Sequence, residues 1–526
     1  MTEVRFVKRI MDKTKKNKQP VFDRAMKWVK RNTIKAEKGC GIAVTSRRQV
    51  IYPEVTGYYI PTLLEWGERG LAKGYAKYLL SVQKLDGSWF DSEDKAPYVF
   101  DTAQILKGLL AFREMDARVD GAIQKGCEWI LSNMQENGRL ATPSEDAWGD
   151  DENVCSELIH IYCLSPLREA GRLYGRKDFL DASEKILNYY ITNNDEQIRH
   201  FSLLSHFYAY VMEGLFDLGQ TELCREAMER LEREYQNRKG GIPALKDVPW
   251  ECSTGMFQLA LVWYKLGELD RGNRIFNRAC SLQNPSGGWY GSYRAPYPFG
   301  WIYAGKIRPK YFRRDEISWA NKYFLDALAW KEKLEFERQA PEFLSKIDRS
   351  DGRYLLVSRK VEEQIRWKWG GIKIADIGCG KGRYIRNLMA DYPDGKYYAV
   401  DISENVMEDI HGMVEKKMGR MTCIPYGDNM FDLVYACESF EHAVNQRAAF
   451  NELFRVTANG GSFLILDKPV EMRGRLRLDE WERWISDQDM KRWADKKGAG
   501  LEIIPSVSYE NNKNDGLFRA WIVTKG

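Results

Sequence analysis

The stretch Ile-Lys-Ile-Ala-Asp-Ile-Gly-Cys-Gly-Lys-Gly-Arg, residues 372–383, runs from an apolar strand directly into a turn with alternating glycines. Glycines in such a turn let backbone N–H groups approach a ligand closely. A second apolar run at 397–400 ends in Asp401. In a parallel sheet, an acidic residue at the end of the next strand can accept both hydroxyls of a ribose. The two pieces together predict a site for a ligand that contains adenosine.

The spacing of the glycines separates this turn from that of dinucleotide-binding domains. Gly378, Gly380 and Gly382 alternate, whereas a dinucleotide fingerprint runs G-x-G-x-x-G. Further blocks follow in a fixed order at 431–436, 441–442, 452–456 and 460–465. In this order the blocks resemble the class I S-adenosylmethionine (SAM)-dependent methyltransferases, nearest to the branch that methylates quinones, sugars and other small acceptors. The resemblance implies an α/β Rossmann-like domain at 353–526 with SAM as its cofactor.

The resemblance also implies which residues do the work. The cofactor contacts it implies are Asp376, Gly378, Gly380, Gly382, Asp401, Ile402 and Glu438. His442, beside Glu441, follows the fourth strand and is the candidate general base for an acceptor hydroxyl, with packing as the alternative. Trp481 precedes a predicted helix and is a candidate aromatic lid for the acceptor, with ordinary amphipathic packing as the alternative.

Short apolar runs at 372–377, 397–400, 431–436 and 462–466 predict strands buried on both faces of a parallel sheet. Two later runs, 501–509 and 517–524, predict an antiparallel pair that closes the sheet. The chain departs from the family between Asp401 and Ile424, where the family usually fits a full helix and strand. Arg420 stands about where the family places an acidic residue near the adenine.

Composition bears on partners and compartment. With 80 basic and 75 acidic residues the net charge is only +5, so we expect no nucleic-acid partner. Cysteines are scattered without a C-x-x-C pair, and we expect no metal site and a cytoplasmic location. Residues 1–20 form a basic tail, either solvated or drawn to an anionic membrane as a peripheral contact. Its cations include Lys8, Arg9, Lys13, Lys15, Lys16 and Lys18.

A repeat precedes the glycine turn. Lys73-Gly74, Tyr78-Leu79, Gln83, Gly87 and Trp89 recur in part at 125–138, 236–241 and 283–289. Self-similarity at a fixed period indicates stacked units. Apolar periodicity between these landmarks predicts outer helices near 21–32, 70–83, 121–134, 178–193, 221–236 and 270–283. It predicts inner helices near 54–66, 99–113, 153–171, 200–218, 250–266 and 316–335.

The stretch from Lys73 to Trp89 resembles the QW repeat of squalene-hopene cyclases, and the whole region resembles the six-hairpin α/α toroids. The resemblance implies an all-α (α/α)6 toroid at 21–338, then a linker at 339–352. An open helical solenoid is the alternative. No D-x-D-D acid motif is present, which argues against alkene-protonating cyclase chemistry. The family also includes glycan hydrolases, lyases and epimerases.

A saccharide ligand fits the loops that lead into the inner helices. Aromatic residues there offer apolar faces for sugar rings, and acidic residues offer acceptors for hydroxyls. The aromatic candidates are Trp89, Phe90, Trp148, Trp250, Trp289, Tyr290, Tyr293, Trp301 and Tyr303, and the acidic ones are Glu54, Asp101, Glu157 and Glu251. Glu54 and Glu251 each start an inner helix, so helix capping is the alternative for them. His206 is the ring histidine to watch.

We therefore expect a SAM-dependent methyltransferase that acts on a saccharide or lipid-linked glycan in cell-surface polysaccharide biosynthesis, with the toroid binding the glycan. Two alternatives stay open. In one, the toroid is a glycan lyase or epimerase and the chain is bifunctional. In the other, it is a noncatalytic module that binds a polyprenyl chain or a protein.

Overall fold

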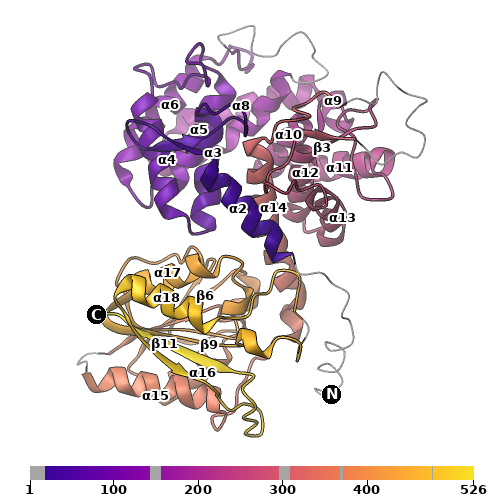
Figure 1. Cartoon of the computed structure of the whole chain (residues 1–526). Coiled ribbons are helices and arrows are strands. Elements are labelled where there is room, and N and C mark those ends of the chain that lie inside the picture. The colour runs from indigo at the N-terminus through magenta and orange to yellow at the C-terminus, as the bar shows by residue number, and fades with distance from the viewer. Residues whose placement is uncertain (1–17, 143–155, 295–308, 368–370, 477) are drawn as a thin grey trace. The chain divides into compact units, whose positions relative to one another are not determined.

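The computed structural model describes residues 18–142, 156–294, 309–367, 371–476 and 478–526. The chain divides into two compact units (Figure 1). One holds residues 23–63 and 69–334, and the other holds 335–526 with the short segment 64–68 and, at the N-terminus, the described residues up to Phe22. Most of the predicted basic tail lies outside the described residues, as do Trp148, Trp301 and Tyr303. No helix in the described part of the chain is long and apolar enough to cross a membrane.

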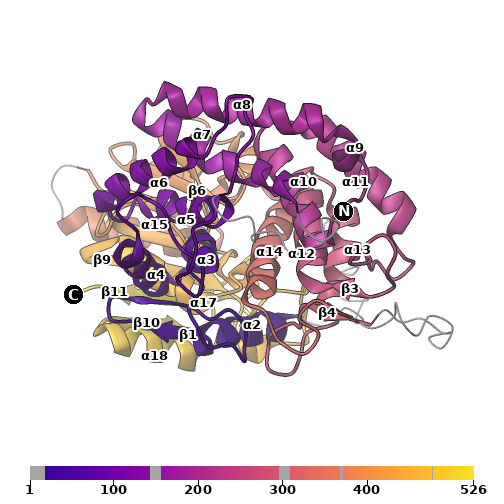
Figure 2. The ribbon, with the colours of Figure 1, turned by 90° about the horizontal axis from the view of Figure 1, so that it is seen from above.

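The first unit consists of six helical hairpins, each an outer helix followed by an inner one, with the inner helices enclosed by the outer set (Figure 2). The outer helices are α2 (Gln19–Arg31), α4 (Arg69–Val82), α6 (Asp120–Ser132), α8 (Lys177–Asn193), α11 (Thr221–Tyr235) and α13 (Leu269–Cys280). The inner helices are α3 (Pro53–Glu65), α5 (Val99–Phe112), η3 (Glu157–Cys163) with α7 (Leu164–Tyr174), α10 (Ser205–Asp217), α12 (Ser253–Lys265) and α14 (Ser318–Gln339). The predicted toroid is confirmed, helix by helix.

Shorter elements join the hairpins. They are β1 (Thr33–Lys35), β2 (Cys40–Ile42), η1 (Ala117–Val119), α9 (Asp195–Arg199), β3 (Glu251–Cys252) and β4 (Ser292–Tyr293). Inner and outer helices differ in burial because neighbours surround the inner ones. In α12 all residues from Ser253 to Tyr264 are buried, whereas in α11 only one face is. The sequences of the inner helices are therefore apolar on every face, whereas those of the outer helices are amphipathic.

The first and last hairpins meet and close the ring. A backbone bridge joins Thr45 to Ile317. The Tyr59 hydroxyl donates to the Ser318 carbonyl at 2.9 Å, and the Thr62 hydroxyl donates to Asp326 Oδ1 at 2.6 Å. These contacts exclude the open solenoid.

The second unit is built on a seven-stranded sheet in the order β10-β11-β9-β8-β5-β6-β7. The strands are β5 (Lys373–Ile377), β6 (Lys396–Asp401), β7 (Val414–Met418), β8 (Phe431–Cys437), β9 (Thr457–Asp467), β10 (Gly500–Ile504) and β11 (Arg519–Thr524). Strands β5 to β9 are parallel, and β11 pairs antiparallel with both β9 and β10. All four predicted buried strands and the closing antiparallel pair are present.

Helices cover both faces of this sheet (Figure 1). The helices are α15 (Gly352–Trp367), α16 (Arg383–Asp391), α17 (Gln446–Val456) and α18 (Asp487–Lys497), with short turns η4 (Ala340–Glu342), η5 (Asn405–Met407), η6 (Phe440–His442) and η7 (Val470–Met472). Side chains of α15 and α16 pack with Ile374 and Leu433, and those of α17 and α18 pack with Ala375 and Val434. Because successive strand residues point to opposite faces, each strand feeds two apolar cores.

Strand β7 was not predicted. Its residues are mostly exposed, and it forms one edge of the sheet, paired only with β6. Lys416 and Lys417 on this edge strand oppose pairing with other chains. Because the strand is exposed and charged, its sequence shows no apolar pattern from which a strand could be predicted. The segment between Asp401 and Ile424 therefore holds a 3-10 turn, η5, and a strand, and no full helix.

Candidate functional site

The glycine turn after β5 is held against the end of β6. The Gly380 N–H donates to Asp401 Oδ2 at 2.9 Å, and the Ser403 N–H donates to Asp401 Oδ1 at 3.3 Å. Gly378 has φ +76°, and a Cβ there would lie 2.5 Å from that of Ser439. A side chain at Gly378 is therefore excluded on both conformational and steric grounds. The carboxylate that ends β6 and the turn that follows β5 form one unit.

These residues fit the adenosyl part of SAM. Asp401 is 9% exposed, and burial raises its pKa while the amides of Gly380, Ser403 and Ile402 oppose that shift. Its two oxygens suit a pair of ribose hydroxyls. A Cβ at Gly380 would meet only Phe343 at 4.0 Å, so the backbone there is open to close approach by a ligand.

Asp376 lies near the end of β5, two residues before Gly378. Burial raises the pKa of Asp376 to about 7, although the Tyr435 hydroxyl opposes the shift. Asp376 Oδ2 has no hydrogen-bond partner among the described residues. The predicted cofactor residues Asp376, Gly378, Gly380, Gly382 and Asp401 thus come together, and half-buried Ile402 follows Asp401 directly.

Glu438, which directly follows β8, forms ion pairs with two arginines. Its Oε1 accepts from Arg353 Nη1 at 2.9 Å and from Arg383 Nη2. Burial alone would raise the pKa of Glu438, but Arg383 and Arg353 hold it below its usual value. Its φ of +54° is rare for a residue with a side chain and marks a constrained position. Sequence reasoning missed both arginines, although Arg383 stands in the opening stretch of the motif.

A second cluster lies where β8 and β9 end. Glu441 Oε1 accepts from Lys468 Nζ and lies 3.5 Å from His442 Nε2, and the Glu441 N–H donates to Asp467 Oδ2 at 2.9 Å. Burial would raise the pKa of Glu441, yet Lys468 and His442 lower it. Burial and the charge of Glu441 raise the pKa of Asp467 and of Glu482, whose carboxyl is hydrogen-bonded to that of Glu441. The cluster thus favours the ionised form of Glu441 and raises the pKa of the two neighbouring carboxyls.

His442 faces the Glu441 carboxylate. Its Nε2 lies 3.5 Å from Glu441 Oε1, which leaves Nδ1 for another partner. The imidazole is 24% exposed and contacts the Phe336 ring edge-on, with 5.1 Å between centroids. The predicted pair His442 and Glu441 is therefore in contact. Lys468, which sequence reasoning missed, is the third member.

The predicted lid is packed rather than open. Trp481 is 6% exposed, and Trp484 donates from Nε1 to Glu482 Oε1 at 2.7 Å. The segment that holds them precedes α18, as predicted. The Trp484 indole supports the Glu441 cluster through Glu482, and the burial of Trp481 agrees with the packing alternative.

In the ring, four predicted ligand residues belong to the wall instead. Trp89 and Trp289 are fully buried, and their Nε1 atoms donate to the carbonyls of Leu79 at 2.8 Å and Ala279 at 2.9 Å. Glu251 is 1% exposed and pairs with Arg278, whose Nη2 lies 2.6 Å from Oε2. Trp250 packs in a small apolar cluster with Leu204, Ala244 and Cys252. These side chains have no free face, which corrects the expectation that they contact a saccharide; Tyr290 is half-buried.

The glutamines of the repeat explain its spacing. Gln83 Nε2 donates to the carbonyls of Gly87 at 3.0 Å and Ala122 at 2.9 Å, so it ties one outer helix to the next. Gln283 and Gly287 repeat the first contact at 3.1 Å. The QW repeat is thus a structural device that joins adjacent hairpins.

Glu54 and Asp101 lie inside the ring, in the first turns of α3 and α5. Each is 5% exposed. Burial raises the pKa of both, and the charge of Asp101 raises that of Glu54 further. His206, also inside, donates from Nδ1 to Gln258 Oε1 at 3.1 Å, and burial lowers its pKa to about 3.

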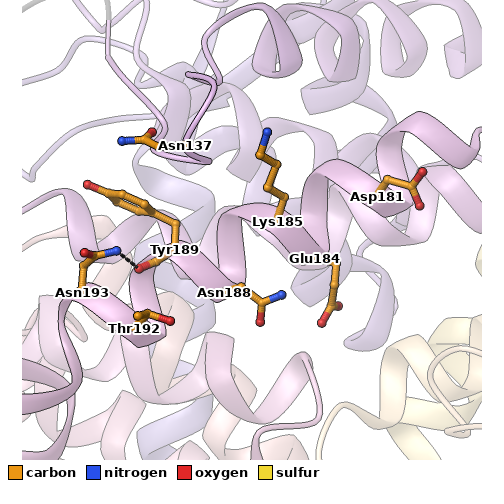
Figure 3. Close-up of a pocket in the computed structure, with 8 residues that line it drawn as sticks. All are labelled: Asn137, Asp181, Glu184, Lys185, Asn188, Tyr189, Thr192 and Asn193. Atoms are coloured by element: carbon orange, nitrogen blue, oxygen red, sulfur yellow. Dashed lines mark hydrogen bonds between the residues drawn. The ribbon is translucent and has the colours of Figure 1, made fainter.

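A polar depression of about 740 Å³ lies on the outer side of α8 (Figure 3). It is lined by Asn137, Asp181, Glu184, Lys185, Asn188, Tyr189, Thr192 and Asn193. None of the predicted site residues lines it, so it is separate from the acids inside the ring.

Comparison with known proteins agrees with the geometry of the sheet unit. Residues 375–465 match the family described as "Methyltransferase domain". The chain is 26% identical over 194 residues to the biotin biosynthesis bifunctional protein BioHC of Teredinibacter turnerae, a match that covers 32% of this chain and 34% of that protein. It is 27% identical over 138 residues to the malonyl-[acyl-carrier protein] O-methyltransferase of Halorhodospira halophila, covering 25% of this chain and 46% of the relative.

The chain thus spans between a third and a half of the length of these two relatives. A solved structure described as a novel alpha-amylase from Clostridium perfringens superimposes with a TM-score of 0.46 at 13% identity, covering 60% of this chain and 99% of that one.

Proposed function

We propose that this chain, whose C-terminal unit is a SAM-dependent methyltransferase domain, methylates a saccharide or lipid-linked glycan that its helical ring binds. We place this reaction in the cytoplasm, in cell-surface polysaccharide biosynthesis. The observation that carries methyl transfer is the hydrogen bond from the Gly380 N–H to Asp401, which joins the glycine turn to the ribose acceptor.

The cofactor side of the proposal assigns a role to each group at the turn. SAM supplies a methyl group activated on a sulfonium sulfur. Asp401 would accept hydrogen bonds from the ribose hydroxyls, and the glycine turn would receive the adjoining part of the ligand through its backbone. Arg383 begins α16 just after the turn and keeps Glu438 ionised. The carboxylate of Glu438 would thus remain charged and fixed in place at the end of β8.

The acceptor side rests on His442. An acceptor hydroxyl becomes a nucleophile when it loses its proton as the new O–C bond forms. In the proposal His442 Nδ1 takes that proton, and ionised Glu441, anchored by Lys468, stabilises the resulting imidazolium. The protein's main contribution is to hold the acceptor oxygen in line with the methyl group.

The glycan part of the proposal rests on the ring interior. Tyrosine rings and two carboxyls offer apolar faces and hydroxyl partners together, which is the combination that sugars require. A lipid-linked glycan would also give the basic tail, with Lys8 and Arg9, an anionic membrane surface to contact.

Two measurements test methyl transfer. We expect SAM to bind the full chain saturably in calorimetry, and label from [methyl-³H]SAM to pass to a glycan fraction. His442→Gln should lower the transfer rate by about 100-fold or more, the usual contribution of a general base, and leave SAM affinity unchanged. The matched control is His411→Gln, at an exposed histidine of the same unit. Failure of the intact chain to bind SAM would refute the proposal.

A further inference from the structure

We infer that the ring interior holds a binding site, centred on Glu54 and Asp101, for a saccharide that carries no acidic group. The inference deepens the proposed function and rests on it in one respect, that the ring is the part that holds the saccharide. It adds the class of sugar and names the side chains that select it.

The first observation is a carboxyl oxygen without a partner. Asp101 is 5% exposed, and its Oδ2 accepts no hydrogen bond from any described residue. The N-terminal cap residue of α5 is Tyr98, whose side chain makes no capping bond. A buried polar atom left without a partner costs about 1–3 kcal/mol, so its retention inside the ring calls for a ligand group.

Glu54 belongs to α3, which packs beside α5 at Gly57 and Ile105 (Figure 2), and it acts with Asp101. It is equally buried and is hydrogen-bonded to the Tyr52 hydroxyl. Burial raises the pKa of both carboxyls, that of Asp101 to about 8, and the charge of Asp101 raises the pKa of Glu54 further. The pair therefore keeps a proton, and it can donate one hydrogen bond while it accepts others.

A belt of tyrosines surrounds the two acids. Tyr58 is hydrogen-bonded to Tyr210, the hydroxyls of Tyr162 and Tyr323 lie 3.2 Å apart, and Tyr311 receives the indole N–H of Trp319 at 3.0 Å. The Tyr210 ring contacts those of Tyr162 and Tyr323, with centroids 4.8 Å and 6.1 Å apart. The rings of Tyr58, Tyr162, Tyr210 and Tyr323 are at most 2% exposed, so a sugar would have to part the belt to meet their faces and hydroxyls, which match its C–H surfaces and hydroxyls.

The charges around the belt exclude an acidic ligand. Lys322 pairs with Asp326 at 2.7 Å, and Lys265 pairs with Glu213 at 3.0 Å. Lys107 lies 2.9 Å from the centre of the Tyr162 ring, and burial lowers its pKa to about 7. The lysines that touch the belt are thus already engaged. A uronate, phosphate or sulfate would meet a carboxyl pair without an arginine fork of the kind that recognises such anions.

A glycan array tests the inference with the full chain, labelled with a fluorophore and applied to neutral, amino, uronate and sulfated glycans. We expect retention of neutral or amino glycans, and at least a tenfold loss for Asp101→Asn and for Glu54→Gln. Glu114→Gln, at an exposed carboxylate of the same unit, should bind like the unaltered chain. Thermal unfolding of each variant checks that the ring is folded.

Retention of acidic glycans only, of no glycan, or of neutral glycans by both variants would overturn the inference. SAM calorimetry on the same preparations keeps the two proposals apart. A chain that binds neutral glycans through Asp101 but binds no SAM would retain this inference and lose the proposed methyl transfer.

Discussion

Buried acids are treated in opposite ways in the two units. In the sheet unit, Glu438 meets Arg353 and Arg383, and Glu441 meets Lys468, so both stay ionised despite burial. In the ring, Glu54 is hydrogen-bonded to the Tyr52 hydroxyl, Asp101 Oδ2 has no hydrogen-bond partner among the described residues, and burial favours the protonated forms of both. Desolvation acts on all four carboxyls, and the presence of a cation decides the outcome.

The difference separates two kinds of site. An ionised carboxylate that is paired with a cation has a fixed position and can orient a histidine. If the cation is removed, the protein loses the free energy that offset the burial of the charge. Protonated carboxyls among tyrosine hydroxyls form hydrogen bonds and carry no net charge. Such groups suit a neutral ligand with several hydroxyls. Four substitutions test this difference between the carboxyls of the two units.

Lys468→Met removes the cation from the Glu441 cluster. Because Glu441 would remain buried without its partner, we expect a loss of about 3–5 kcal/mol in the free energy of unfolding. Urea denaturation measures it, in the transition that SAM shifts. Lys417→Met, at an exposed pair with Glu415, is the control and should change stability by less than about 1 kcal/mol. Equal effects of the two substitutions would contradict the anchoring role of Lys468.

Asp401→Ala removes the acceptor that faces the glycine turn. We expect SAM affinity to fall by about 100-fold, since hydrogen bonds to a charged group contribute about 1.5–3 kcal/mol each. Calorimetry measures the change, and Glu404→Ala at the exposed neighbour should leave affinity unaltered. Unchanged binding by the Asp401 variant would mean that the cofactor lies elsewhere.

Trp89→Phe sharpens the contrast by testing a ring residue that we assign to the wall. The variant loses the hydrogen bond to the Leu79 carbonyl, and we expect the ring to lose about 1–2 kcal/mol of stability. Glycan binding should persist on the array, because the indole presents no free face. A stable variant that no longer bound glycan would reverse this assignment.

Asp101→Asn should affect stability in a pH-dependent way. The pKa of Asp101 is raised in the folded state, so its contribution is fully present below the unfolded pKa of about 4 and is lost as pH rises above it. Asparagine has no such loss. We therefore expect the variant to gain stability relative to the unaltered chain by up to about 1.4 kcal/mol per pH unit between pH 4.5 and pH 8, as measured by urea denaturation. A difference that did not vary with pH would show that Asp101 is ionised in both states.

Local patterns were sufficient for most of the fold. The runs at 372–377 and 431–436 appear as β5 and β8, and the twelve predicted helical stretches of the ring all appear. Strand β7 was missed because its exposed, lysine-containing residues carry no apolar period. The glycine turn and Asp401 were also predictable, since their roles depend on backbone conformation and on order along the chain.

The sequence by itself determined the order of elements, the glycine turn and the acid at the end of β6, because strand burial and positive φ impose residue types at short spacing. Only the tertiary structure decided which cation meets which acid: Arg353 lies 85 residues before Glu438, and Lys468 lies 27 after Glu441. It also decided that Trp89 belongs to the wall, while Asp101 Oδ2 finds no hydrogen-bond partner among the described residues. Such pairings depend on burial and on distance in space, which the spacing of residues along the chain does not predict.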